Sequence, residues 1–291
     1  MQREHLIALG VFLLWMNASL SAVTGQVVNN KDQRAEAYFR EAEKYYEEYQ
    51  FEKAASSFKK AIELKPDYVQ AYNDLGMSFA ALGRHKEAME ALQAAIRLRP
   101  DFAVGYNNLG CEYVQTGALE AALKSFQQAL NRNPKYALAY NNLGAVLSEL
   151  GRPLEAIDAY EKALNLRPEW SEAQRNLALA SYPAGDLKRV FAHLQEAIRL
   201  KPDYFEAYNN LGVLYHQQRN DREAVASFAQ ALKIKPDYAD ALYNLGALQL
   251  SLNQRSDALG QYHKLKNLNP DLAAALYGGI YRGMILDLRN K

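Results

Sequence analysis

Seven of the nine prolines in this chain recur every 34 residues, and no other feature of the sequence limits the possible folds so strongly. They are Pro66, Pro100, Pro134, Pro168, Pro202, Pro236 and Pro270. A fixed spacing of this kind means that one structural element has been copied along the chain. If each copy ends two residues after its proline, the copies span 35–68, 69–102, 103–136, 137–170, 171–204, 205–238 and 239–272. We call them repeats one to seven and number the places in each repeat from its first residue.

Each repeat is expected to be two helices joined by a short turn. The first helix of repeat two is indicated by the i, i+3, i+4, i+7 spacing of Tyr72, Leu75, Gly76 and Phe79. The second is indicated by the i, i+4, i+7 spacing of Ala88, Leu92 and Ala95. Gly83 marks the turn between them, and Pro100 ends the second helix because it lacks an N–H donor. Asp101 then stands where a side chain can cap the next helix.

The pattern resembles the tetratricopeptide repeat, which places Leu-Gly, aromatic residues, small residues and proline at fixed positions in 34 residues. Repeat three carries it at Tyr106, Leu109, Gly110, Tyr113, Ala122, Phe126, Ala129 and Pro134. The seven repeats cover 238 of the 291 residues. The resemblance implies an all-α fold, a right-handed α-solenoid of seven helix-turn-helix hairpins. Residues 273–291 are expected to form a C-terminal capping helix, with Asp271 as its cap.

The N-terminal segment departs from the repeats. Arg3 and His5 precede an apolar run from Leu6 to Met16 and a stretch of small residues, which is typical of a secretory signal peptide over residues 1–25. Residues 26–34 are expected to be a linker. The alternative is an uncleaved membrane anchor, although a span needs about 20 apolar residues. We therefore expect an exported protein, in a bacterial periplasm or secreted, with membrane contact only if this segment stays attached.

Composition and motifs favour neither nucleic-acid binding nor catalysis. The chain has 34 basic and 33 acidic residues, so its net charge of +1 creates no field that would attract nucleic acid. Cys111 is the only cysteine, which excludes an intramolecular disulfide. The histidines fall at unrelated places, and no glycine-rich phosphate loop is present. We expect no enzyme activity, no catalytic or metal-binding residues and no cofactor.

The sixth place of the repeat points into the concave face of tetratricopeptide superhelices. Here this place holds, from repeat one onward, Arg40, Asp74, Asn108, Asn142, Asn176, Asn210 and Asn244. The row is similar to the asparagine ladder in the repeat domain of O-linked N-acetylglucosamine transferases, which implies that Asp74 and the five asparagines bind a peptide backbone. An asparagine amide has both donors and an acceptor, so the same residues could instead bond within or between hairpins. Further asparagines at place five, Asn73, Asn107, Asn141 and Asn209, favour a polar binding surface.

The predicted function is that of an exported scaffold that binds an extended peptide or a partner surface. The alternative is an accessory subunit that recruits substrates to a separately encoded enzyme such as a glycosyltransferase. A clamp for peptide carboxylates is not expected, because Arg40 is the only cation at the corresponding places.

Repeat five is degenerate. Its departures from the pattern are Gln174, Ala178, Ser181 and Pro183. A proline near the end of a first helix is expected to shorten or kink it. This irregularity is either a tolerated defect or a hinge at Tyr182-Pro183.

Overall fold

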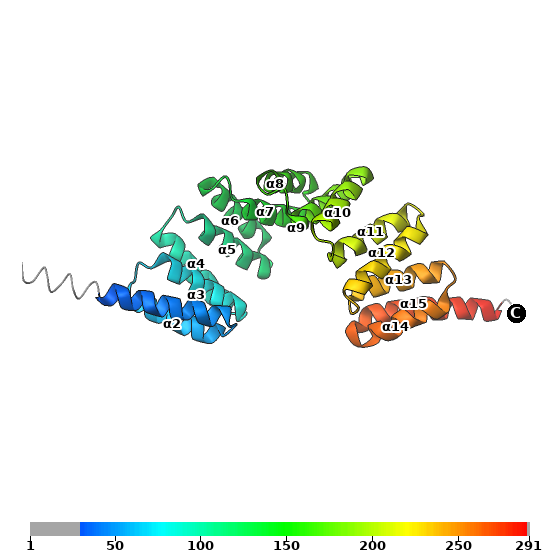
Figure 1. Ribbon diagram of the computed structural model, residues 1–291, viewed down its shortest axis with the longest axis horizontal. Helices are drawn as coiled ribbons and strands as arrows, with labels where there is room; N and C mark the ends of the chain where they lie inside the picture. Colours follow the sequence, from blue (N-terminus) through cyan, green and yellow to red (C-terminus); the bar gives the residue numbers. More distant parts are fainter. Residues whose placement is uncertain (1–29, 290–291) are drawn as a thin grey trace, which may run out of the picture. The chain divides into compact units, whose positions relative to one another are not determined.

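The computed structural model describes residues 30–289, and this part of the chain consists of helices and turns without a β-strand. In chain order the helices are residues 30–47, α2 (Phe51–Leu64), α3 (Val69–Ala81), α4 (His85–Leu98), α5 (Ala103–Gln115), α6 (Leu119–Arg132), α7 (Ala137–Glu149), α8 (Pro153–Leu166), α9 (Ser171–Ser181), the 3₁₀ turn η1 (Tyr182–Ala184), α10 (Leu187–Leu200), α11 (Phe205–Gln217), α12 (Asp221–Ile234), α13 (Ala239–Ser251), α14 (Arg255–Leu268) and α15 (Pro270–Arg289). Each repeat supplies two helices (Figure 1). The expected all-α solenoid of helical hairpins is confirmed.

The chain forms two compact units, which divide between Ala139 and Tyr140 inside α7. In the N-terminal unit, α3 packs on α2 and α4, and α5 packs on α4 and α6. In the C-terminal unit, α11 packs on α10 and α12, and α13 packs on α12 and α14. First helices of successive repeats also touch, as α3 does with α5 and α11 with α13. Neighbour-to-neighbour contact of this kind is the packing rule of repeat proteins.

Glycine at place eight lets the two helices of a hairpin meet. A Cβ on Gly110 would lie 2.6 Å from Cε1 of Phe126, the ring at place 24 of the same repeat. Gly212 stands in the same relation to Phe228, also at 2.6 Å. Because real Cβ atoms do not approach a ring so closely, a larger residue at place eight would force the helices apart.

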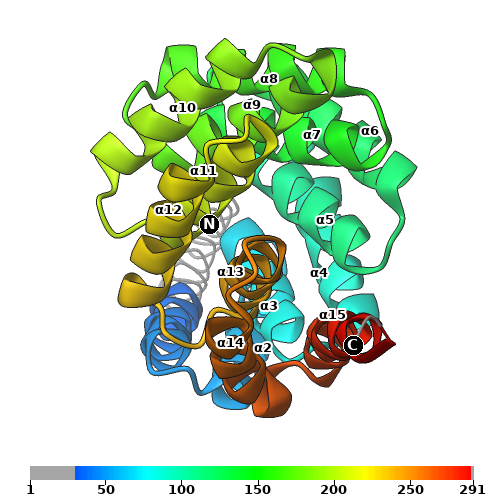
Figure 2. The same cartoon turned by 90° about the vertical axis from the view of Figure 1, so that its right-hand side faces the viewer.

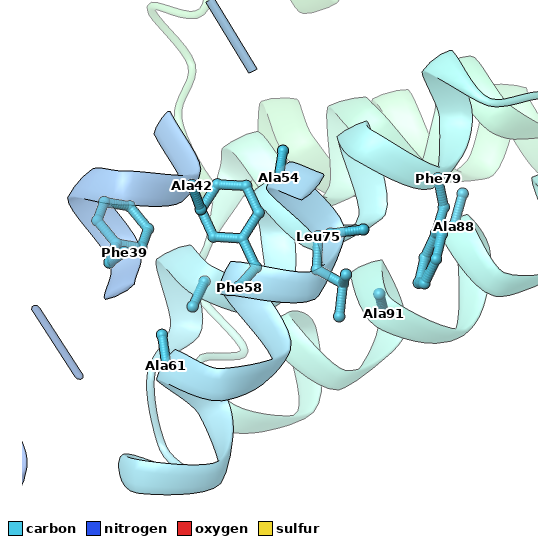
Figure 3. Close-up of a cluster of buried hydrophobic side chains, with 11 residues drawn as sticks. Phe39, Ala42, Ala54, Phe58, Ala61, Leu75, Phe79, Ala88 and Ala91 are labelled. Atoms are coloured by element: carbon cyan, nitrogen blue, oxygen red, sulfur yellow. The ribbon is translucent and has the colours of Figure 1, made fainter. Parts of the chain in front are cut away.

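The core continues from one hairpin to the next. In the N-terminal unit Phe39, Phe58, Leu75 and Phe79 are buried together between the helix 30–47 and α2, α3 and α4 (Figure 3). Small residues fill the remaining places of this cluster, among them Ala42, Ala54, Ala61, Ala88 and Ala91. A ring therefore faces a small residue, which allows the layers to interdigitate.

Every hairpin turns on a residue with left-handed backbone at place 15. Four of these residues are glycines, with φ between 70° and 75°: Gly83, Gly117, Gly151 and Gly185. The other three are Tyr49 (φ 59°), Arg219 (φ 63°) and Asn253 (φ 64°). The turn predicted at Gly83 is confirmed, and the same geometry is kept where the glycine is missing.

Repeat five is irregular in the way that its proline predicts. Its first helix, α9, has 11 residues, whereas α11 and α13 each have 13. The 3₁₀ turn η1 follows α9 directly and contains Pro183. Ala178 replaces the glycine at place eight, and Leu194 replaces the ring at place 24. A larger residue thus faces a smaller one, and the two changes compensate in volume.

The helix ends differ from the sequence predictions in three places. The first helix begins at residue 30, so residues 30–34 of the expected linker are helical, since Lys, Gln and Arg are good helix formers. Asp101 does not cap α5, because Phe102 holds the N-cap position and no side chain bonds there. The C-terminal helix begins at Pro270 and not at residue 273.

Asn269, and not Asp271, caps the C-terminal helix. Its Oδ1 accepts the backbone N–H of Leu272 at 3.1 Å, and Pro270 suits the first helical position, where no N–H is needed. Helix α15 packs on α13 and α14 (Figure 2). It buries Ala273, Leu276 and Ile280. The expected role as a closing helix agrees with this packing.

The predicted signal peptide, residues 1–25, lies outside the described residues. Among the helices of residues 30–289, none has the combined length and apolar character needed to cross a membrane.

The left-handed turns give a stability prediction. An L-residue at such a φ costs about 1–2 kcal/mol, part of which is offset because glycine loses more freedom on folding. We expect Arg219→Gly to raise the free energy of unfolding by up to about 1 kcal/mol, since the exposed Arg219 side chain packs little. The reverse change at the equivalent place, Gly117→Arg, should lower it by a similar amount. Urea denaturation measures both, and a loss of stability in Arg219→Gly would contradict this account of the turn.

Candidate functional site

The predicted peptide-binding residues stand on successive first helices. Asp74 lies on α3, and the asparagines at place six lie one each on α5, α7, α9, α11 and α13. All six side chains are half-buried, while Arg40, at the same place in repeat one, is exposed. We call these six residues the ladder.

Ladder amides bond to the preceding repeat. The Nδ2 of Asn108 donates to Oδ1 of Asn73 at 2.9 Å, across a separation of 35 residues. Two further pairs with the same separation join Asn176 to Asn141 at 3.2 Å and Asn244 to Asn209 at 3.0 Å. The donor is always at place six and the acceptor at place five of the repeat before. The structural use of these asparagines, which sequence left open, is therefore present in the fold.

Of the four asparagines at place five from which the sequence suggested a polar surface, only Asn141 is half-buried and the other three are buried. Asn73, Asn107 and Asn209 are buried, with at most 7% of their surface exposed. Their amides turn inward: Asn73 donates to Asp74 Oδ1 at 2.8 Å, and Asn107 donates to Asn108 Oδ1 at 3.3 Å. A buried amide needs hydrogen-bond partners, and the place-five asparagines find them in the side chains of the ladder.

The ladder retains hydrogen-bonding capacity for a ligand. Asn108 uses one N–H towards Asn73 and one lone pair of its oxygen towards Asn107. An asparagine side chain has two N–H donors and two acceptor sites, so one of each remains. One donor and one acceptor are what a peptide group requires.

The ladder is interrupted at repeat five. Arg175 stands at place five, where the other bonded pairs have an asparagine, and a guanidinium cannot accept a hydrogen bond. Asn210, 35 residues later, accordingly has a buried Nδ2 that finds no acceptor among the described residues. The Nε of Arg175 is likewise buried and unpaired.

Recesses open beside the ladder at equivalent places of three repeats. Each lies between the first helices of two successive repeats, on the residue at place 24, with a ladder residue in its wall. Their volumes are about 260 Å³ in repeat one, 320 Å³ in repeat four and 150 Å³ in repeat five. The ladder residues concerned are Asp74, Asn176 and Asn210.

The recesses share a position but differ in chemistry. The repeat-one recess is acidic and aromatic, with lining residues Glu43, Tyr46, Glu47, Phe58, Asp74 and Met77. The repeat-four recess is mixed and includes Ser148, Glu149, Tyr160 and Asn176. The repeat-five recess has mainly aliphatic walls. The same position in the repeat therefore carries different surface chemistry in different repeats.

Asp74 is the one carboxylate in the ladder. Burial raises the pKa of Asp74, a hydrogen bond from Asn73 lowers it, and the charge of Glu43 raises it again. The net pKa lies above the usual range, because removal from water disfavours the charged form.

The one cysteine of the chain, Cys111, is not an activated nucleophile. Burial raises the pKa of the Cys111 thiol to about 11, so the thiol is protonated at neutral pH and is a poor nucleophile. Within residues 30–289, no cluster of three His, Cys, Asp or Glu side chains has the geometry to hold a metal ion.

Sequence reasoning identified the ladder and missed the recesses. The residues at places nine, 12 and 13 differ too much between repeats to form a visible pattern, as Glu43, Ala145 and Leu179 show at place nine. The available signal was their position one or two helical turns beyond place six, on the same face of the first helix.

The interruption of the ladder predicts unequal effects of two equivalent substitutions. Asn244→Ala removes a hydrogen bond and leaves Oδ1 of Asn209 buried without its donor, which costs about 1–3 kcal/mol. Asn210→Ala removes an amide whose donor is already unpaired, so its cost should be smaller by about 1 kcal/mol or more. Urea denaturation of the two variants makes the comparison, and equal losses would contradict it.

Asp74 predicts a pH-dependent stability. A carboxyl whose folded pKa is raised destabilises the fold above that pKa, and the cost disappears as the pH falls through it towards the unfolded value. Asp74→Asn should therefore raise the free energy of unfolding at pH 7, with an advantage that shrinks on acidification. The exposed Asp67→Asn serves as the control. A constant difference from pH 7 to pH 3 would refute this reading of Asp74.

Comparison with known proteins agrees with the architecture. The family model of the cilia and flagella-associated protein 70 C-terminal domain matches residues 14–242, and the tetratricopeptide repeat model matches residues 240–271. No curated protein matches the chain significantly.

Solved structures show the same fold. A tetratricopeptide repeat protein from Parabacteroides merdae is 18% identical, with 86% of this chain and 99% of that chain covered and a TM-score of 0.69. YrrB, described as a TPR protein with an unusual peptide-binding site, is 24% identical over 65% of this chain and 97% of its own, with a TM-score of 0.53. MamA is 27% identical over 55% of this chain and 94% of its own, with a TM-score of 0.51. The chain belongs to the tetratricopeptide repeat family, in the group defined by the C-terminal domain of cilia and flagella-associated protein 70.

Proposed function

We propose that this protein is a non-enzymatic interaction scaffold that binds an extended peptide segment of a partner along the ladder residues within a compact unit. The observation that carries the proposal is the recurrence of recesses beside half-buried ladder residues at the same places of three repeats. Folds of this family present repeated surfaces to protein partners, and that coarse role follows from family membership.

The ladder would bind the backbone of the peptide, and the recesses would bind its side chains. Spare donors and acceptors of the asparagine amides bond to the peptide backbone, which is the same for every sequence. The recesses receive side chains, and their differing chemistry supplies the choice of sequence. Because the hydrogen bonds between repeats already hold the amides in place, little side-chain freedom is lost on binding.

We also propose that the protein is exported. The support is the basic start, short apolar run and small residues of the N-terminal segment, which lies outside the described residues. The partner would then be a protein of the periplasm or the extracellular space.

The test separates the binding role of the ladder from its structural role. Peptides are first selected from a displayed random library on the immobilised full chain. The double variant Asn176→Ala/Asn244→Ala removes two ladder amides, whereas Asn141→Ala/Asn209→Ala breaks the same two inter-repeat bonds from the acceptor side. Both doubles lose the same bonds, but only the first loses groups that face a ligand.

We expect the ladder double to bind the selected peptides at least about tenfold more weakly, since each lost hydrogen bond contributes about 1 kcal/mol. The acceptor-side double should stay within about threefold of the parent affinity, with thermal unfolding confirming that both fold. Equal weakening by the two doubles would mean that the asparagines serve the fold alone. A library that yields no binding peptide would also reject the proposal.

A further inference from the structure

We propose that the repeat-five recess, between α9 and α11, is a specific pocket for one uncharged apolar side chain of leucine or phenylalanine size. The inference deepens the proposed function, on which it rests for the peptide nature of the partner. It assigns to the degenerate repeat five an anchor role that its sequence alone does not suggest.

The walls of the recess are aliphatic. Its lining includes Leu179, Val190, Leu194, Val213 and Leu214, and no charged side chain contributes to it. The equivalent recess of repeat one has three carboxylates, of Glu43, Glu47 and Asp74. A charged side chain among the aliphatic walls of the repeat-five recess would lose hydration without meeting an opposite charge, so the recess disfavours it.

The irregular sequence of repeat five supplies the apolar space. Five of the seven repeats have phenylalanine or tyrosine at place 24, whereas repeat five has the smaller Leu194, as repeat two has Leu92. Serine stands at place 11 in repeat five, where repeat two has Phe79, and α9 ends at this residue, Ser181. Two large rings are thus absent from this hairpin.

The size fits a single side chain. The recess has a volume of about 150 Å³. This volume is close to that of a cavity that can hold one benzene ring, about 150 Å³. At its mouth Leu179 is 42% exposed and Tyr182 is 40% exposed, which is apolar surface that an occupant would cover.

Polar groups border the recess where the backbone of an occupant would run. Tyr182 Oη donates to Gln217 Oε1 and so joins η1 to the end of α11. Asn210 lines the recess, and its buried Nδ2 lacks an acceptor. Rotation of this amide about its last side-chain bond presents the N–H to a backbone carbonyl. Aliphatic walls with a few polar groups at the edge are typical of pockets that bind small ligands.

The occupant is therefore an apolar residue in an extended segment, held by its side chain and by its carbonyl oxygen. The unpaired donor indicates the carbonyl, the volume indicates the size, and the uncharged lining indicates the side-chain class. A charged residue at this point of the partner is excluded by desolvation.

The test uses single-residue probes on the full chain with labelled methyl groups. N-acetyl-leucine methylamide and N-acetyl-lysine methylamide offer the same backbone with an apolar or a charged side chain. In NMR titrations, the leucine probe should shift the methyl signals of Leu194, Val213 and Leu214 in a saturable way. The lysine probe should bind at least tenfold more weakly.

Two variants locate the interaction. Leu179→Glu places a carboxylate at the mouth of the recess and should abolish the shifts, whereas Leu252→Glu, at a leucine of similar exposure outside the recess, should preserve them. Asn210→Leu should weaken the leucine probe by about threefold to tenfold through loss of one hydrogen bond. Circular dichroism confirms that each variant folds.

Absence of saturable shifts up to the solubility limit would overturn the proposal, as would equal affinities for the two probes. Equal loss of binding in Leu179→Glu and Leu252→Glu would do the same. Since these probes are single residues, the result does not depend on the ladder experiment. A negative result in the probe titration would not contradict peptide binding along the ladder. A negative result with the ladder variants would not contradict this pocket.

Discussion

The close contact between the glycine at place eight and the residue at place 24 determines how the two helices of a hairpin lie. In repeat three a Cβ on Gly110 would come within 2.6 Å of the Phe126 ring, so the ring packs directly on the backbone of the facing helix. That separation sets where the first helix lies on the second, and hence where its sixth place points. The residue at place 24 also lines each of the three recesses, although in repeats one and five it faces an alanine, Ala42 or Ala178, at place eight.

Much of the fold could be predicted from the sequence because the residue types that recur in each repeat are those that helix packing requires. Proline recurs where a helix ends, glycine where the chain turns or two helices meet closely, and alanine where helices pack. Each of these requirements concerns a few neighbouring residues and is therefore visible in the sequence. The capping residues were harder, because Asp101 and Asp271 have the right type but the chain places Phe102 and Asn269 at the cap. Cap geometry depends on a shift of one or two residues, which periodicity does not resolve.

The positions of the ladder residues were predictable because they recur at a fixed place of the repeat. Their hydrogen-bond acceptors at place five were not predictable. Sequence places Asn73 and Asn108 on different helices and cannot tell that their amides meet, whereas the structure brings them to 2.9 Å. The recesses could not be predicted from the sequence, because each is formed by several side chains from two successive repeats. In repeat five, Ser181 is recognisable from the sequence as a departure from the pattern, whereas the effects of Arg175 and Leu194 appear only in the structure. Together they leave an unpaired amide beside an apolar hollow.

The pairing of place six with place five of the previous repeat has a consequence for how such a chain can grow. Repeats three, four and six have asparagine at both places, so each carries a donor for the repeat before it and an acceptor for the repeat after it. A duplicated copy of such a repeat would contain both residues of the pair. A repeat with asparagine at place six can form this bond with any preceding repeat that has asparagine at place five. Repeat five keeps its donor, Asn176, but has lost its acceptor to Arg175, and so it can join the array only at a junction that forgoes this bond. Duplication of a repeat that has asparagine at both places therefore preserves this bond. Each added copy of repeat five would instead create one more junction with an unpaired amide.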